Sequence, residues 1–161
     1  MGRITRRLEF DAAHRVMRHE SKCRNLHGHR YVVEVTIEGD LDPLGRVVDF
    51  GVVKSVLGEW IDEWLDHGVV CNSRDTDLVA LCQANEWKVV TIADENPTAE
   101  VLADFLVGIA RNLLELPDSG LKVVGVRVWE TPNCYADSTP ETLGRSAKIV
   151  ASDFKITRGR A

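Results

Sequence analysis

The stretch from Cys23 to His29, CRNLHGH, holds the side chains of this sequence that are best suited to chemistry. His27 and His29 stand one residue apart at the start of an apolar, alternating segment that predicts a β-strand. Because residues i and i+2 of a strand share a face, about 6.7 Å apart, both imidazoles can reach one metal ion. The Cys23 thiol adds a titratable group nearby. The alternative is an ordinary strand with two surface histidines and a buried cysteine, so a metal site requires a third ligand.

A third ligand is available upstream, where apolar residues alternate with polar ones. Phe10 and Ala12 share one parity, which is typical of a half-buried strand, and His14 continues it. If this strand pairs as a hairpin with the strand that His29 begins, His14 faces His27 and His29 across the ladder. Three histidine ligands with one open position are the pattern of a catalytic zinc site, so the sequence predicts Zn²⁺ as the cofactor.

Length and composition favour one soluble domain and exclude several classes of protein. The 161 residues are 44% hydrophobic and 28% charged, which are ordinary values for a globular chain. A net charge of −5 argues against a nucleic-acid partner, which prefers a basic face. No apolar run approaches the ~20 residues that span a bilayer, so no membrane partner is expected, and the N-terminus lacks an apolar signal segment. Four cysteines without CxxC spacing predict a reduced, cytoplasmic protein.

Two amphipathic helices are expected to form one layer of the fold. The first spans residues 52–65, with Asp49 as its N-cap and Gly68 as its C-terminal stop. The second opens with Asn96 as N-cap and Pro97 at the first helical position, where a missing N–H costs nothing.

Strands form the other layer, which makes an α+β domain in the order β-β-α-α-β-β. The sequence predicts an antiparallel four-stranded sheet with both helices on one face. The expected strands cover residues 3–13, 29–38 and 121–130, with short strands near Tyr135 and at 146–151. We assign residues 1–155 to this single domain and residues 156–161 to a short basic tail.

Residues 69–95 are predicted to form a small insertion between the two helices, as decoration on the domain. Within it, 77–84 is expected to be a short helix and 88–92 a short strand. Cys71 and Cys82 are expected to be buried structural thiols.

Two further patterns could carry chemistry. Asp66 and His67 are adjacent at a helix exit, which suits an acid–base pair, although His67 could simply favour the negative end of the helix. Glu130 continues the parity of Val126 and Val128, and a carboxylate on an apolar strand face either is paired or meets a ligand. A structural salt bridge is the alternative for Glu130.

A basic loop lies between the two histidine segments. It has two readings: a solvated loop, or a landing area for phosphate, because arginine can bind phosphate oxygens with two parallel hydrogen bonds. The residues concerned are Arg15, Arg18, His19, Lys22 and Arg24.

Several short motifs resemble, in order, those of the 6-pyruvoyltetrahydropterin synthase superfamily, and within it the bacterial 6-carboxytetrahydropterin branch of queuosine biosynthesis. The resemblance runs from Phe10 to Asn133. The motifs are FDAAH (10–14), CRNLHGH (23–29), VDF (48–50), LDH (65–67), NPTAE (96–100) and WETPN (129–133).

The resemblance implies a role for each candidate residue. His14, His27 and His29 would be the zinc ligands, and Cys23 the thiolate that abstracts a proton. Asp66 and His67 would be the partner acid–base pair. Glu130 would anchor the guanidine-like edge of a pterin, with Thr98 and Glu100 in contact with the substrate. The implied substrate is 7,8-dihydroneopterin triphosphate, whose side chain a zinc ion would make more acidic.

The resemblance also implies the tunnelling fold, with trimers stacked into a homohexamer and active sites shared between subunits. The three residues between Cys23 and His27 resemble the carboxy branch, which releases acetaldehyde and triphosphate; pyruvoyl synthases, which only eliminate triphosphate, tend to have a longer gap. Gly68 departs from the second histidine that many relatives have after LDH. A zinc- or pterin-binding relative without turnover is a further alternative, and an aldolase or cyclohydrolase of this fold is a weaker one.

Overall fold

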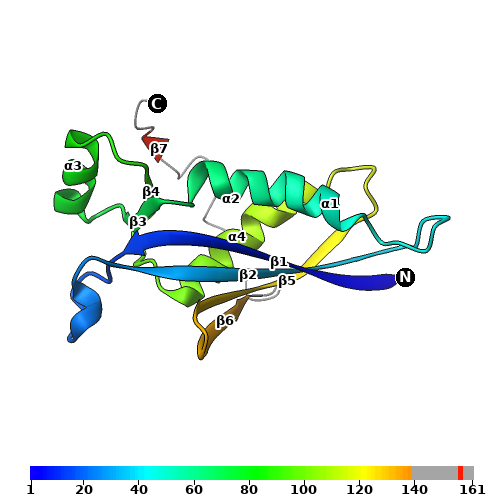
Figure 1. Ribbon diagram of the computed structural model, residues 1–161, viewed down its shortest axis with the longest axis horizontal. Coiled ribbons are helices and arrows are strands. Elements are labelled where there is room, and N and C mark those ends of the chain that lie inside the picture. Colours follow the sequence, from blue (N-terminus) through cyan, green and yellow to red (C-terminus); the bar gives the residue numbers. More distant parts are fainter. Residues whose placement is uncertain (139–155, 158–161) are drawn as a thin grey trace.

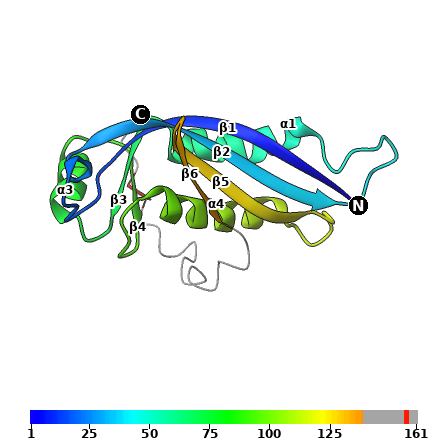
Figure 2. The same ribbon diagram turned by 90° about the horizontal axis from the view of Figure 1, so that it is seen from below.

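Seven strands form one mixed, curled sheet in the computed structural model, which describes residues 1–138 and 156–157. Their order in space is β6-β5-β2-β1-β3-β4-β7 (Figure 1). The strands are β1 (Gly2–His14), β2 (His27–Gly39), β3 (Gly68–Asn72), β4 (Val89–Ile92), β5 (Lys122–Thr131), β6 (Cys134–Ser138) and β7 (Ile156–Thr157). Seen from below, the long helices lie together on one side of β1, β2 and β5 (Figure 2).

The β1–β2 hairpin is the longest antiparallel pair, and its alternation is the one expected. Residues on the helix-facing side are buried because they form the core against the helices. On this side lie Leu8, Phe10, Ala12 and His14 of β1, and Tyr31, Val33, Val35 and Ile37 of β2. Gly2 pairs with Gly39 at one end and His14 with His27 at the other, without a register shift. The hairpin therefore confirms the predicted parity, and both strands run slightly further than predicted.

The first helix is continuous from Phe50 to Trp64, as α1 (Phe50–Val53), the π-helical η2 (Lys54–Gly58) and α2 (Glu59–Trp64). Asp49 is its N-cap, as predicted, because its carboxylate accepts a hydrogen bond from Gly51 N at 2.7 Å. The prediction that Gly68 stops the helix is wrong. His67 takes the left-handed conformation, with φ of 56°, and Gly68 already begins β3.

The second long helix, α4, runs from Ala99 to Leu114 and buries an apolar stripe against the sheet. The predicted N-cap, Asn96, is wrong. Thr98 is the N-cap, and its hydroxyl accepts from Val101 N at 3.4 Å. The side chain of Asn96 instead bonds the backbone of Met17, so it is not available to the helix. Among the described residues, no helix is both long and apolar enough to cross a membrane.

The prediction of a four-stranded, all-antiparallel sheet is wrong, because the insertion joins the main sheet. β3 runs parallel to β1 at Ala12–His14, and β4 runs parallel to β3. All residues of both inserted strands are buried, as in parallel strands that are covered on both faces. Such strands lack the alternation that marks a half-buried strand. The predicted helix in the insertion is confirmed as α3 (Thr76–Ala84), and Cys71 and Cys82 are buried as expected.

Two smaller differences concern the C-terminal strands. A register shift places Gly125 opposite Thr36 but Val123 opposite Ile37, so Val124 is the extra residue of a β-bulge. Val123 is therefore buried and Val124 is only half-buried, while Val126 and Val128 keep the predicted parity. β7 pairs with β4 from within the predicted basic tail. The strand predicted at 146–151 lies outside the described residues.

Candidate active site

Three histidines converge where the β1–β2 hairpin ends. The register sets His14 opposite His27 and Ala12 opposite His29, so all three side chains lie on the helix-facing side. One nitrogen from each ring lies within 4.8 Å of the others. Nε2 of His14 and Nε2 of His27 are 3.2 Å apart. The structure therefore brings the three predicted metal ligands together.

Backbone carbonyls orient two of these rings. His14 Nδ1 lies 2.8 Å from the carbonyl oxygen of Pro97, and His27 Nδ1 lies 2.7 Å from that of Asn25. A carbonyl can only accept, so each Nδ1 carries the proton and each Nε2 keeps a lone pair toward the other histidines. Metal-binding histidines are commonly held in this way, through the ring nitrogen that does not bind the metal.

The electrostatic surroundings also suit a metal site. His14 is 1% exposed, and this burial lowers its pKa, because a charged ring is disfavoured away from water. Burial likewise lowers the pKa of His29. Both effects favour the neutral imidazole, which is the form that binds a metal ion. The donor set, its tautomers and its convergence fit a zinc ion.

Glu130 and Tyr31 border the three histidines. Glu130 Oε1 lies 3.6 Å from His14 Nε2, which is the one ion-pair contact recorded for Glu130 within residues 1–138 and 156–157. The Tyr31 ring is edge-on to His14 and His29, with centroids 5.8 Å and 5.7 Å away. Tyr31 is fully buried, and its hydroxyl has no hydrogen-bond partner in the described part of the chain. The sequence contains no sign of this buried tyrosine hydroxyl beside the histidines, other than the shared strand parity of Tyr31 and His29.

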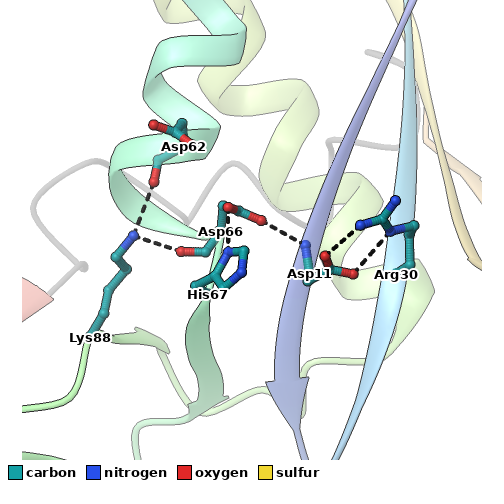
Figure 3. Close-up of polar contacts among 6 residues, drawn as sticks. All are labelled: Asp11, Arg30, Asp62, Asp66, His67 and Lys88. Carbon is teal, nitrogen blue, oxygen red and sulfur yellow. Dashed lines mark hydrogen bonds and ion pairs between the residues drawn. The ribbon is translucent and has the colours of Figure 1, made fainter.

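The structure places Asp66 and His67 at the outer edge of β1 (Figure 3). Asp66 Oδ1 accepts from Asp11 N at 2.8 Å, and His67 N donates to Asp11 O at 2.7 Å. His67 Nδ1 lies 2.6 Å from Asp66 Oδ2, so the predicted pair is formed. Lys88 Nζ fixes the preceding turn by donating to the carbonyl of Asp66 at 2.6 Å. Asp11 also binds Arg30 on the neighbouring strand, at 2.8 Å.

Hydrogen bonds keep the Asp66 carboxylate of this pair ionised. Burial alone favours the protonated carboxyl, but the bonds from Asp11 N and His67 outweigh it and hold the pKa of Asp66 below its usual value. The His67 side chain is 78% exposed and lines a groove of about 950 Å³ between β1 and the first helix. Among the described residues, the hydrogen bonds of this pair reach Asp11, Lys88 and the helix end at Ile61, and not the three histidines.

The remaining predicted residues, Cys23, Thr98 and Glu100, are not part of the three-histidine group. Cys23 is half-buried in the short 3₁₀ helix η1 (Lys22–Arg24) and is not part of the metal-binding group. Thr98 caps α4 next to Pro97, and Glu100 is exposed in the first turn of that helix. Arg15 of the basic loop is bound by both carboxylate oxygens of Asp75, so it is already paired.

Sequence reasoning missed the groups that hold the candidate ligands. The carbonyls of Pro97 and Asn25 have no side-chain signature, and the partner of His14 is 83 residues away in the chain. Their roles depend on where the backbone passes, which residue types do not encode. The sequence presents the NPT segment as a helix start and as part of the NPTAE motif, and neither pattern indicates that the Pro97 carbonyl meets His14.

Comparisons with known proteins agree on one family. A family model described as 6-pyruvoyl tetrahydropterin synthase matches residues 3–141. A 6-carboxy-5,6,7,8-tetrahydropterin synthase of Rickettsia bellii (strain RML369-C) is 40% identical over 139 residues, covering 85% of this chain and 99% of that protein. A protein of the same name from Haemophilus influenzae (strain ATCC 51907 / DSM 11121 / KW20 / Rd) is 32% identical over 144 residues, covering 85% of this chain and 98% of that protein.

Solved structures show the same fold. The 6-pyruvoyl tetrahydropterin synthase of Caenorhabditis elegans superposes with a TM-score of 0.61 at 24% identity, over 86% of this chain and 94% of that one. An uncharacterized protein of Wolinella succinogenes reaches a TM-score of 0.71 at 24% identity, over 86% of this chain and 98% of that one. At this identity the likeness concerns the fold alone, and it confirms the expected α+β architecture. With a family match over 3–141 and relatives at 32% and 40% identity, the chain belongs to the 6-pyruvoyl tetrahydropterin synthase family.

Proposed function

We propose that this chain is a zinc-dependent 6-carboxy-5,6,7,8-tetrahydropterin synthase. It converts 7,8-dihydroneopterin triphosphate to 6-carboxytetrahydropterin and releases acetaldehyde and triphosphate. The observation that carries the proposal is the convergence of three histidine nitrogens within 4.8 Å, in a chain whose relatives at 32% and 40% identity bear that name. A metal or pterin carrier without turnover is disfavoured, because it needs neither a thiol four residues before His27 nor a hydrogen-bonded Asp66–His67 pair.

The histidines would hold the zinc ion, which supplies Lewis-acid polarisation of the substrate side chain. His14 and His27 are set for this by the carbonyls on their Nδ1 atoms. Cys23 takes the proton from the substrate carbon, since a thiol near a cation can be held as thiolate. The Asp66–His67 pair moves the second proton, with Asp66 orienting the imidazole through the 2.6 Å bond at Nδ1.

Glu130 anchors the pterin in this proposal. A carboxylate accepts two parallel N–H bonds from an amidine-like edge. Its recorded ion-pair contact is with His14 rather than with an arginine or lysine, which speaks against the structural salt bridge. Thr98 and Glu100 complete the substrate contacts from the first turn of α4. Because Arg15 is paired with Asp75, the exposed Arg18, Lys22 and Arg24 are left as the candidates for binding triphosphate.

We also propose that the active site is completed by a second copy of the chain, within a homohexamer. β1 pairs with β2 along its whole length but with β3 only at Ala12–His14, so in the described part of the chain most of its outer edge is open for another strand. His67 lies beside this open edge, where it can serve a neighbouring chain. The four unpaired cysteines support a cytoplasmic location.

The product assay tests the chemistry directly. Zinc-loaded protein incubated with 7,8-dihydroneopterin triphosphate should give 6-carboxytetrahydropterin and acetaldehyde, identified by mass. A product that has lost triphosphate but kept the side-chain carbons would instead assign the pyruvoyl activity. Zinc and pterin binding without any product would make the chain a binding relative.

Replacing Glu130 by glutamine should weaken substrate binding and leave the fold unchanged. Hydrogen bonds to a charged group contribute about 1.5–3 kcal/mol each, so we expect KM to rise by roughly 10- to 100-fold. The melting temperature should stay near that of the parent, because no lysine or arginine partner of Glu130 is recorded among the described residues. Thermal melts and steady-state kinetics measure both.

The matched control for Glu130 is Glu59→Gln, an exposed glutamate of α2, which should change neither quantity. A marked loss of stability in Glu130→Gln at unchanged KM would assign Glu130 to a salt bridge instead.

A further inference from the structure

The loop between His14 and Cys23 is closed by backbone contacts of its own. Val16 N donates to the carbonyl oxygen of Cys23 at 2.9 Å, and His19 N donates to the carbonyl of Val16 at 3.2 Å. Arg18 takes the left-handed conformation, with φ of 62°. The position of the Cys23 backbone therefore depends on where Val16 lies.

Asn96 holds the residue next to Val16 at two points. Its Oδ1 accepts from Met17 N at 3.0 Å, and its Nδ2 donates to Met17 O at 3.1 Å. A pair of bonds to the N–H and C=O of one residue fixes both the place and the orientation of that backbone, whereas a single bond would leave it free to rotate. Nδ2 of Asn72, at the end of the inserted β3, lies 3.5 Å from Asn96 Oδ1.

The neighbour of Asn96 holds the metal ligand. Pro97 O accepts from His14 Nδ1 at 2.8 Å. Two consecutive residues therefore bind the loop and the ligand: Asn96 binds Met17, and Pro97 binds His14. Helix capping does not explain the asparagine, because Thr98 caps α4. Both polar atoms of the Asn96 side chain instead form hydrogen bonds to the loop backbone at Met17.

We propose that Asn96 is a positioning residue that holds Cys23 in place relative to the three histidines. It acts through the backbone of Met17 and through the bond from Val16 N to Cys23 O. The inference rests on the proposed function, in which the Cys23 thiol is the base. A misplacement of about 1 Å at a reacting group can cost roughly 10²-fold in rate. Loss of the two hydrogen bonds between Asn96 and Met17 should therefore lower kcat more than it lowers the stability of the fold.

The test compares Asn96→Ala with Asn85→Ala, whose asparagine makes an exposed bond to Leu81 O at the end of α3. In Asn96→Ala, kcat should fall by roughly 10- to 10²-fold, with a much smaller change in KM and with zinc content retained, since the Pro97 carbonyl remains. In a Cys134→Ser background, alkylation of Cys23 by iodoacetamide should become severalfold faster, because the released loop exposes the thiol. Asn85→Ala should change none of these.

Non-additivity separates this inference from the proposed function. If Asn96 acts through the thiol, the double variant Cys23→Ala/Asn96→Ala should turn over no more slowly than Cys23→Ala alone. The inference would be overturned if the double variant lost kcat by the product of the two single-variant losses. It would also be overturned if Asn96→Ala kept its kcat and alkylation rate while Cys23→Ala was inactive. Either result would leave the proposed function standing. Full turnover in Cys23→Ala would reject both. If Asn96→Ala folds poorly, the isosteric Asn96→Asp, which keeps only the acceptor for Met17 N, takes its place with the same expected results.

Discussion

Replacing Cys23 by alanine should lower kcat by roughly 10²-fold or more while zinc content and substrate affinity stay unchanged. The thiol is half-buried on η1 and lies outside the group of three histidine ligands, so its loss removes a base without removing a metal ligand. Metal analysis, substrate binding and steady-state kinetics on this one variant measure the three quantities.

Other outcomes assign Cys23 to other roles. Loss of zinc together with activity would make it a fourth metal ligand, and the metal site would be a closed, structural one. A small loss of stability with normal turnover would make it a packed thiol. Cys134→Ala is the matched control, because that thiol is exposed on β6 and should change neither metal nor rate.

The same variant tests whether active sites are shared between chains. Cys23→Ala and His67→Ala chains should each be inactive alone, and mixing them under conditions of subunit exchange should restore part of the activity. Recovery is expected because a mixed oligomer contains sites in which an intact Cys23 meets an intact His67. No recovery after proven exchange would place a complete active site within one chain.

Replacing His27 by alanine should remove most of the bound zinc and abolish turnover. Nε2 of His27 lies 3.2 Å from Nε2 of His14, so the change deletes one of three converging donors. The loss of zinc affinity should exceed the roughly 10- to 100-fold that follows when a group that merely orients a ligand is removed. Metal content by mass spectrometry and competition with a chelator measure it.

The control for the metal prediction is His19→Ala. That histidine belongs to the basic loop, where its Nδ1 accepts from Ser21 N at 2.9 Å, and it is not part of the three-histidine group. Its replacement should leave zinc content unchanged. Full zinc occupancy with normal activity in His27→Ala would refute the assignment.

The hairpin and its three histidines could be predicted from the sequence because they depend on local alternation. Side chains of a strand change face at every residue. His14 therefore lies on the same face as the buried Phe10, and His27 and His29 lie on the same face as the buried Tyr31. Asp49 as an N-cap was equally local, because a cap bonds a residue only two positions away. The roles of Cys23, Asp66 and Glu130 came from the resemblance to a family.

Tertiary structure alone decided how the pieces are held together. The strand predicted at 88–92 is confirmed as β4, but β3 was missed because a strand covered on both faces shows no alternation. The parallel pairing of β3 and β4 with the main sheet was missed as well. Asn96 was read as a helix cap, since residue type cannot show that its amide meets Met17, 79 residues earlier. The carbonyl of Pro97 on His14 is backbone, which every residue carries. A sequence specifies local geometry through side-chain period, whereas contacts between distant backbones exist only once the whole sheet and both helices have packed.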